Sequence, residues 1–305
     1  MENNANVKKI RHKSGLNENL ASYLMLAPFF ICFVIFLVVP IISSIALSFT
    51  NYDMINTPSF EGLGNYLRMF LDDDVLPEVF KNTLLFAVIC GPVGFLLSFV
   101  LAWFINEFSP MARTLLSFMF YAPALVGNAV FIWQVAFSSD SYGYVNSALL
   151  SLGLITEPVT WLSTEQYIKP IVIAVQLWSS MGVSFLTNIS GLQNVNQELY
   201  EAGSIDGIRN RWQELWYITL PTMKNMLVFS AVTQISSAFS ISAVAIQLAG
   251  FPSVGYAADT IVSHMQDLGT VRYELGYASA VAVVLFLMMV LFRLIVGKLL
   301  NMTGK

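Results

Sequence analysis

The sequence predicts an all-α integral membrane protein with six membrane-spanning helices. Hydrophobic residues make up 56% of its 305 residues, and Asp, Glu, Lys and Arg together make up only 11%. Soluble domains carry about 25% charged residues, which cover their water-exposed surface. Six long stretches of the chain also lack any charged residue. These observations exclude a soluble enzyme, a nucleic-acid-binding domain and a disordered tail.

The charge-free stretches locate the spans. A charge at the bilayer centre costs about 2.5–3.5 kcal/mol, and about 20 apolar residues cross the hydrocarbon core as a helix. The stretch between Lys81 and Glu107, for example, holds no Asp, Glu, Lys or Arg. We therefore predict a membrane domain over residues 20–305, with helices near 20–48, 82–105, 114–137, 170–192, 225–249 and 275–297.

Two further segments surround or interrupt these spans. Residues 1–19 are expected to form a cytoplasmic N-terminal segment. The apolar run after them is longer than the core of a signal peptide and no A-x-A site follows it, so we expect an uncleaved first span. The charge-free stretch between Asp140 and Glu157 is shorter and more polar, which predicts a short interfacial or external helix.

The distribution of Lys and Arg predicts the orientation, since basic residues concentrate on the cytoplasmic side of membrane proteins. With the N-terminus inside, 11 of the 15 Lys and Arg residues fall inside and 4 fall outside. Both termini of this multi-pass chain are then cytoplasmic. The acidic run Asp72–Asp74 falls outside, where we expect it to be a solvated loop.

The loop between the fourth and fifth predicted spans holds more acidic, basic and aromatic residues than a simple connector needs. Asn196 can cap a helix whose first turn holds Glu198. Gly207 permits the positive φ that would end this helix, and a second helix is expected after it. Pro221 then closes an irregular stretch and starts the fifth span. Such an element could dock a cytoplasmic partner or lie on the lipid surface, and these residues leave both possibilities open.

This loop, residues 193–224, carries a motif. Glu201-Ala202-Gly203, then Gly207, then Ile218-Thr219-Leu220-Pro221 resembles the EAA motif of ABC importer permeases, which reads E-A-A, three residues, Gly, about nine residues, and I-x-L-P. There are two departures. Gly203 replaces the second Ala and should weaken the helix by about 1 kcal/mol, which predicts looser docking. Ten residues separate Gly207 from Ile218, and we expect the extra one in the turn after Gly207.

The resemblance covers most of the chain and is strongest to the carbohydrate branch of the family, the maltose-type permease subunits. SYLMLAPFF and SFTNYD flank the first span as in that family. The phrase Gly64-Asn65-Tyr66-Leu67-Arg68 follows, and Glu274-Leu275-Gly276-Tyr277-Ala278-Ser279-Ala280 opens the last span. The resemblance implies a type I ABC importer permease fold with a cytoplasmic coupling helix.

In this family the coupling helix sits in a cleft of an ATPase subunit. Carried over to this sequence, Glu201 and Gly207 become the central docking positions, and Asp206 and Arg211 become contacts at the rim. The predicted docking residues are Glu201, Ala202, Gly203, Asp206, Gly207, Arg211, Leu220 and Pro221.

The resemblance also implies partners and a function. The partners are a second homologous permease subunit, an ATPase dimer in the cytoplasm, an extracellular solute-binding protein and membrane lipid, with no nucleic acid. The function is import of a sugar, an oligosaccharide, across the bacterial cytoplasmic membrane by alternating access. The chain lacks the G-x-x-x-x-G-K-[ST] loop. ATP and Mg²⁺ are therefore expected on the ATPase, and this chain is expected to hold no cofactor and to be no enzyme.

Neutral polar and aromatic residues are the candidates for the substrate pathway, because proteins bind sugars by hydrogen bonds and by stacking on aromatic faces. Thr233, Ser237 and Ser240 share one helix face by their i, i+4, i+7 spacing. Small polar residues also pack helices together, so a packing role stays open. Spacing relative to the maltose-type relatives selects Gln176, Trp178, Ser179, Gln234 and Ser237. Ser240 completes the candidates because it shares a helix face with Ser237.

No catalytic or metal-binding residues are predicted. Cys32 and Cys90 both lie in apolar runs and are expected to be small core-filling residues. The loop Gly250–Gly255 could be a gate, a contact for the binding protein or a plain turn.

Two other functions stay open. The same fold could import another solute such as a glycerol-phosphate, although a phosphate calls for a pore-facing Arg or Lys and none lies within a predicted span. A stand-alone facilitator would need no ATPase, and the EAA-like loop argues against it. No acid, base or histidine lies deep in a span, which argues against a proton-coupled carrier.

Overall fold

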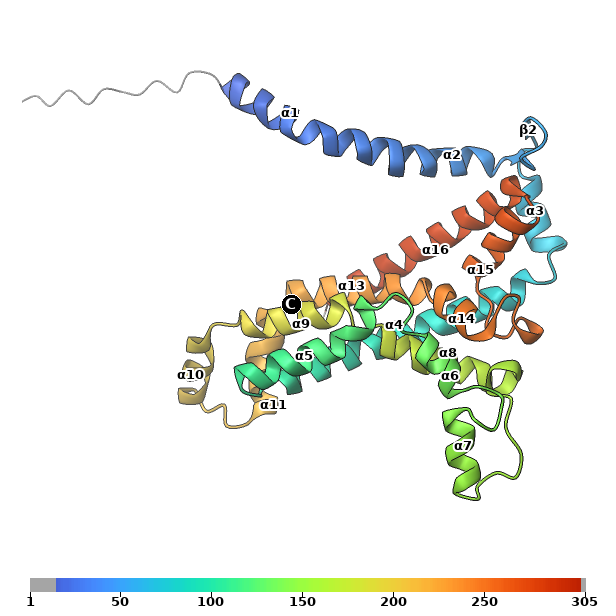
Figure 1. Ribbon diagram of the computed structural model, residues 1–305. Coiled ribbons are helices and arrows are strands. Elements are labelled where there is room, and N and C mark those ends of the chain that lie inside the picture. Colours follow the sequence, from blue (N-terminus) through green and yellow to red (C-terminus); the bar gives the residue numbers. More distant parts are fainter. Residues whose placement is uncertain (1–14, 303–305) are drawn as a thin grey trace, which may run out of the picture.

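The computed structural model describes residues 15–302, and these residues are almost entirely helical (Figure 1). The predicted N-terminal segment 1–19 lies mostly outside the described residues. Within the described residues there is one sheet, an antiparallel pair formed by β1 (Thr50–Asn51) and β2 (Ser59–Phe60). Both cysteines are free.

Four helical stretches are long and apolar enough to cross a membrane, or five when one bent pair counts as a single span. The four are Ser22–Leu47, Leu76–Asn106, Lys224–Ala249 and Leu275–Ile295. They match the first, second, fifth and sixth predicted spans. Their elements are α1 (Gly15–Phe33), the π-helix η1 (Val34–Val38), α2 (Val39–Leu47), α4 (Leu76–Asn106), α13 (Lys224–Phe239), α14 (Ser242–Ala249) and α16 (Leu275–Met302).

The bent pair matches the fourth predicted span. α8 (Glu165–Ser179) and α9 (Val183–Gln193) meet at an angle of 42°, with the flexible Gly182 at the break. The third predicted span, 114–137, is not one continuous helix, which corrects the prediction. α5 (Pro110–Leu125) and α6 (Phe131–Ala136) are separated by residues 126–130. Pro123 lies in the last turn of α5 and cannot donate a backbone hydrogen bond.

The centre of the bundle is α4, which packs against both α9 and α13. Phe99 of α4 and Phe185 of α9 belong to one buried cluster, which also contains Leu192 near the end of α9. Phe86 of α4 belongs to a second cluster, together with Val172 of α8 and Ile241. α4 is therefore buried along two successive parts of its length and connects the two ends of the bundle.

Short elements lie at the two ends of the bundle (Figure 1). One end, here the α10 end, carries α10 (Gln197–Ile205), α11 (Arg211–Glu214), the π-helix η3 (Leu215–Thr219) and α12 (Leu220–Thr222). The opposite end, here the α15 end, carries the short helix expected between Asp140 and Glu157, which is confirmed as α7. The elements of the α15 end are α3 (Gly64–Leu71), α7 (Tyr144–Ser151), η2 (Trp161–Ser163), η4 (Val254–Tyr256), α15 (Ile261–Gln266) and the π-helix η5 (Asp267–Val271).

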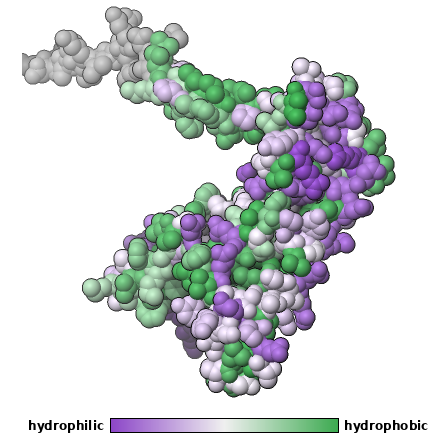
Figure 2. Space-filling view, turned by 45° about the vertical axis from the view of Figure 1, so that its right-hand side comes forward, coloured by the Kyte–Doolittle hydropathy of each residue, from purple (hydrophilic) through white to green (hydrophobic). Residues whose placement is uncertain are grey.

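The first span lies apart from the rest of the bundle. No part of its most apolar window is buried inside the structure, and hydrophobic side chains cover its surface (Figure 2). Its contact with the bundle is made at the α15 end, where α2 packs against α16. Such a surface is stable only against lipid or another apolar protein surface.

Candidate functional site

Residues 196–222, from the cap of α10 to the end of α12, are here called the α10 segment. Its helices begin and end at residues whose local conformation and hydrogen bonds explain these boundaries. The side chain of Asn196 accepts a hydrogen bond from the backbone N–H of Glu198 (3.1 Å) and caps α10. Gly207 has φ +97°, a conformation that glycine adopts without steric cost. Asn210 then caps α11 by accepting a hydrogen bond from the N–H of Gln213 (2.8 Å). The predicted cap at Asn196 and the predicted break at Gly207 are both confirmed.

The predicted docking residues divide into an exposed and a buried set. Glu201, Ala202 and Asp206 are exposed on α10 or directly after it, whereas Gly203 is buried. Ile205, which sequence reasoning missed, is 86% exposed. The sequence did contain a sign of this exposure, because Ile205 lies four residues after Glu201 and residues four apart share a helix face. Ile205 thus shares the exposed face of α10 with Glu201.

Gly203 is buried and faces Ile208 and Ile218 of the same chain. The replacement of the motif's alanine by glycine therefore affects packing within the chain. A Cβ on Gly203 would lie 2.7 Å from Cδ1 of Ile218 and 3.1 Å from Cδ1 of Ile208. The two halves of the motif therefore touch at Gly203, and the side chain of Ile218 occupies the space that an alanine methyl group would take. The expectation of looser docking is not supported by this position, because Gly203 is not on the exposed face.

The residues before Pro221 are helical rather than irregular, which corrects the prediction. Leu215–Thr219 forms the π-helix η3 and Leu220–Thr222 forms α12. The hydroxyl groups of Tyr200 and Thr219 lie 2.9 Å apart and tie α10 to η3. A π turn holds one more residue than an α turn, so η3 offers a place for the extra residue besides the turn after Gly207. Leu220 is half-buried and Pro221 is exposed.

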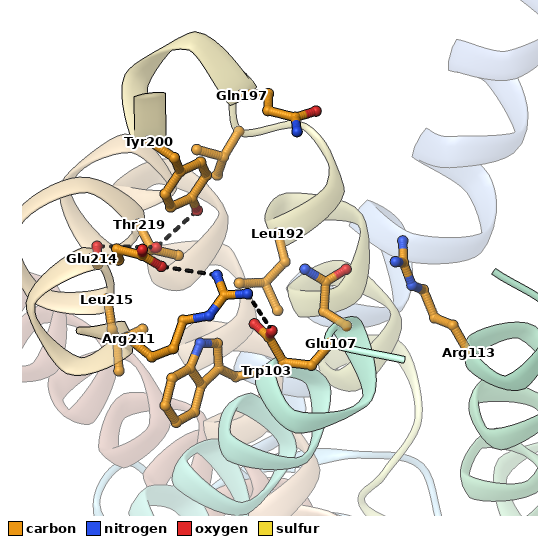
Figure 3. Close-up of a pocket in the computed structure, with 12 residues that line it drawn as sticks. Trp103, Glu107, Arg113, Leu192, Gln197, Tyr200, Arg211, Glu214, Leu215 and Thr219 are labelled. Atoms are coloured by element: carbon orange, nitrogen blue, oxygen red, sulfur yellow. Dashed lines mark hydrogen bonds and ion pairs between the residues drawn. The ribbon is translucent and has the colours of Figure 1, made fainter. Parts of the chain in front are cut away.

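A cavity of about 370 Å³ lies behind α10, between the ends of α4 and α9, the start of α5, and α11 (Figure 3). Arg211 lies within it and binds two carboxylates. Its Nη1 is 2.9 Å from Glu214 Oε2, and its Nη2 is 2.8 Å from Glu107 Oε2. The hydrogen bond with Glu214 raises the pKa of Arg211, and the charge of Glu107 adds to this. The guanidinium of Arg211 is thus held by this chain's own acids, and its predicted contact with the ATPase stays a prediction.

The two candidate pathway glutamines are buried between helices. Gln176 of α8 is 4% exposed and Gln234 of α13 is 2% exposed. The side-chain amide of Gln176 donates to the hydroxyl of Ser237 (3.4 Å) and to its backbone carbonyl (3.3 Å). Ser184 of α9 donates to Oε1 of Gln234 (3.0 Å). Both glutamines therefore join helices in this structure, and their role in a substrate pathway stays a prediction.

The other pathway candidates lie nearer the surface. Trp178 is half-buried and makes an edge-to-face contact with Trp133 of α6, with ring centroids 5.6 Å apart. Ser179 is half-buried, and its hydroxyl has no hydrogen-bond partner among residues 15–302. Ser240 is exposed and its hydroxyl donates to the carbonyl of Ser236 (3.1 Å). Trp178 therefore keeps an aromatic face that a ligand could engage, whereas the hydroxyl oxygen of Ser179 is buried.

Sequence reasoning missed the polar residues that join α4 to α9 and α13. Asn188 of α9 is fully buried and donates to the hydroxyl of Ser98 of α4 (3.2 Å). Gly94 of α4 lies against the amide group of Gln234, where a Cβ would overlap it. The available signal was Gly91 and Gly94 within an apolar span, because small residues let membrane helices approach closely.

At the α15 end, three of the four family phrases meet one another, namely SFTNYD, Gly64–Arg68 and Glu274–Ala280. Asn65 of α3 donates to the carbonyl of Thr50 (2.9 Å), and the N–H of Gly276 in α16 donates to the carbonyl of Tyr52 (3.0 Å). Arg68 Nη1 lies 2.7 Å from Glu274 Oε2. A Cβ on Gly276 would clash with the backbone carbonyl of Thr50. These phrases therefore hold the start of the last span against the end of the first.

Asp73 corrects the prediction of a solvated acidic run. Asp72 and Asp74 are exposed as expected, but the side chain of Asp73 is only 9% exposed. The hydroxyl of Tyr277 donates to Asp73 Oδ2 (2.6 Å), and His264 Nε2 lies 2.8 Å from the same oxygen. Burial alone would raise the pKa of Asp73, but the hydrogen bonds of His264, Tyr277 and the backbone N–H of the next helix lower it well below its usual value. The ionised form of Asp73 is therefore favoured, and its carboxylate connects the starts of α4 and α16 to α15.

No group of His, Cys, Asp and Glu side chains in the described part of the chain could hold a metal ion.

Comparison with known proteins gives consistent results. Residues 84–301 match the family described as binding-protein-dependent transport system inner membrane component. The probable ABC transporter permease protein YesP of Bacillus subtilis (strain 168) is 30% identical over 294 residues, which cover 94% of this chain and 93% of YesP. The arabinooligosaccharides transport system permease protein AraP of the same organism is 31% identical over 289 residues, covering 93% of this chain and 89% of AraP.

A solved structure supports the same fold. One chain in the crystal structure of a bacterial ABC transporter involved in the import of the acidic polysaccharide alginate superposes with a TM-score of 0.80. The two chains are 25% identical, and the match covers 95% of this chain and 98% of the other. From the family match and the extent of the likeness to YesP and AraP, the chain belongs to the family of inner membrane components of binding-protein-dependent transport systems.

Proposed function

We propose that this chain is one of two homologous permease subunits of an ATP-driven importer that carries an oligosaccharide into the cell by alternating access. The observation that carries this proposal is α10, an exposed helix at one end of the bundle with the motif residues Glu201 and Ala202 on its surface. In the EAA family the corresponding helix docks to an ATPase. This chain has no phosphate-binding loop of its own, so ATP and Mg²⁺ belong to that partner.

The orientation of the chain in the membrane is part of the proposal. Six spans place the α10 end in the cytoplasm and the α15 end outside, with both termini cytoplasmic. The excess of Lys and Arg on the α10 side supports this orientation. In this arrangement the third span consists of α5 and α6 with their interruption, and α8–α9 forms the fourth span.

The choice of an oligosaccharide as cargo follows from the relatives and from an available aromatic side chain. AraP is named for arabinooligosaccharides, and the solved structure is an importer of a polysaccharide. Trp178 offers an aromatic face near the break between α8 and α9. Such a face suits a polyhydroxylated ligand, which stacks on aromatic rings.

The first test is to purify the tagged protein from native membranes in mild detergent and to identify its partners by mass spectrometry. We expect an ATPase, a second permease of similar size and an external solute-binding protein. The binding protein is then tested against a panel of oligosaccharides by thermal shift, since a ligand that binds the native state raises its Tm. Recovery of the chain alone, from a preparation that still transports, would favour a stand-alone facilitator instead.

The second test separates ATP-driven import from facilitated diffusion. The purified complex is reconstituted in liposomes with the binding protein and the oligosaccharide that it binds. Uptake against a gradient should require ATP on the side of the ATPase and should stop with a non-hydrolysable analogue. Uptake that is equal with and without ATP would overturn the proposal. A panel that selects a phosphorylated solute instead of a sugar would overturn the choice of cargo.

A further inference from the structure

α10 is joined through the chain to the fourth and fifth spans but not to α4. The chain enters α10 from α9 and leaves it through α11, η3 and α12 into α13. α4, the central helix of the bundle, ends at Asn106 beside this segment. Any movement of α10 that also reaches α4 has to pass through side chains.

α9 and α13 pack against α4 along the bundle, and two side chains of α11 contact the end of α4 directly. Arg211 Nη2 lies 2.8 Å from Oε2 of Glu107, the residue that caps the C-terminal end of α4. The ring of Trp212 lies against the ring of Trp103 of α4, with centroids 5.1 Å apart and planes tilted by 54°. Figure 3 shows the guanidinium of Arg211 between Glu107 and Glu214, with Trp103 beside it.

The guanidinium of Arg211 is oriented by its own helix. Its Nη1 is 2.9 Å from Oε2 of Glu214, three residues later in the chain. This bond holds one edge of the planar guanidinium, and the other edge then faces Glu107. A planar, pre-oriented group loses less conformational freedom when it binds a second carboxylate.

The ion pair with Glu107 is too exposed to be a main source of folding stability. The side chain of Arg211 is 64% exposed and that of Glu107 is 39% exposed, and exposed ion pairs contribute little to the stability of a fold. What the pair does provide is a fixed distance between two elements that the chain does not connect. Its effect is therefore expected on the relative movement of these elements.

We propose that Arg211 and Glu107 form a joint through which movement of the α10 segment is transmitted to α4. Arg211 is then a positioning residue of this chain and not a contact of the ATPase. This inference rests on the proposed function, in which α10 is the element that the ATPase moves. With the joint intact, closure of the ATPase displaces the second span together with the fourth and fifth.

The test uses the complete importer in liposomes, with the oligosaccharide transported per ATP hydrolysed as the readout. Arg211→Gln and Glu107→Gln each remove one side of the joint, and the double variant removes both. Arg209→Gln is the matched control. It removes the same charge two residues earlier in the same loop, from an exposed arginine whose side chain forms no ion pair within residues 15–302.

Both single variants should lower the transport-to-hydrolysis ratio by at least about twofold, with Arg209→Gln unchanged. The transport-to-hydrolysis ratio of the double variant should be no lower than that of the more affected single variant, because the two substitutions remove the same interaction. If the fold-losses in the transport-to-hydrolysis ratio of the two single variants multiplied in the double variant, the joint would be overturned. So would a loss of bound ATPase in Arg211→Gln but not in Glu107→Gln, which would make Arg211 a rim contact.

Hydrogen exchange tests the joint without transport and so separates it from the proposed function. In the purified chain, Arg211→Gln and Glu107→Gln should both increase exchange of residues 197–214, Arg211→Gln at least as much because it also loses the bond to Glu214, and Arg209→Gln should not. Equal protection in all four proteins would overturn the joint, even if the wild type imports sugar. Failure of ATP-driven uptake in the wild type, with this exchange pattern present, would overturn the proposed function and leave the contact between Arg211 and Glu107 established.

Discussion

Gly94 of α4 lies directly against the side-chain amide of Gln234 in α13, so closely that a side chain at position 94 would force this buried amide to move. A Cβ at Gly94 would also lie 3.2 Å from the hydroxyl of Ser180. Gln234 is in turn held by Ser184 of α9. One glycine therefore sets the spacing of three helices at the centre of the bundle.

The first prediction concerns this spacing. Gly94→Ala should destabilise the protein by about 1–3 kcal/mol, because overpacking a filled site forces buried groups to move. Gly91→Ala, one turn earlier, is the control. A Cβ there would meet only Cγ1 of Ile235, at 4.0 Å, and alanine favours a helix by about 1 kcal/mol over glycine. Thermal unfolding measured in detergent should show a lower Tm than the wild type for Gly94→Ala but not for Gly91→Ala. Equal Tm values for Gly94→Ala and the wild type would refute the close approach.

The second prediction concerns Gly207 and the coupling of transport to ATP. Proline fixes φ near −65°, whereas Gly207 has φ +97°, so Gly207→Pro must distort the turn after α10. We expect ATP hydrolysis to continue while transport falls, with the spans still inserted. Gly153→Pro is the control, because Gly153 also has a positive φ (+68°) but follows α7 at the opposite end. Full-rate transport by Gly207→Pro would remove the coupling role from this segment.

The third prediction concerns Asn146, which organises the lobe around α7. It is fully buried, and its amide group donates to the carbonyls of Ser138 (3.1 Å) and Val159 (3.0 Å). Its Oδ1 accepts from Nε1 of Trp161 (2.8 Å). Asn146→Ala leaves these groups unpaired, at about 1–3 kcal/mol each. Hydrogen exchange should rise across residues 138–164 and stay unchanged in α4, and the exposed Ser147→Ala should alter neither. Unchanged protection of the lobe would contradict this role.

The fourth prediction concerns Asp73 and pH. Its pKa is lowered in the folded protein, so the folded state favours the ionised form. The stability that this provides is fully present above the ordinary Asp pKa of about 3.9 and is lost as the pH falls towards the lower folded value. Asp73→Asn should therefore show its largest deficit in Tm near neutral pH, and the deficit should shrink below about pH 4. A deficit that grows on acidification would contradict the assignment. Asp72→Asn, at an exposed neighbour, should behave like the wild type.

The parts of this molecule that sequence reasoning found are those determined by local chemistry. Residues 82–105 lack charge and had to be helical in lipid, and α4 confirms them. Asn196 and Gly207 act through backbone groups within three residues, so a cap and a break could be predicted from their neighbours. In the third span, which is interrupted after Pro123 at residues 126–130, absence of charge was not sufficient to predict a continuous helix.

The parts that were missed depend on residues distant in the chain. Nothing near Arg211 indicates that Glu107, on another helix, accepts its second bond. Gln234 was selected as polar in an apolar span, which is correct as a sign of importance. Its partner Ser184 and its neighbour Gly94 lie on two different helices, and only the packing of all three shows that its amide is enclosed by protein.

The isolated first span has a consequence for how the chain is made. α2 finds its partner in α16, the last helix of the described chain, and the two are held together by Tyr52, Gly276 and the pair formed by Arg68 and Glu274. α2 is therefore synthesised long before α16, the helix against which it packs. During that interval its apolar surface remains in contact with lipid or with the insertion machinery. Truncation before α16 should consequently leave an inserted but unanchored N-terminal helix, a state that quality-control proteases can recognise.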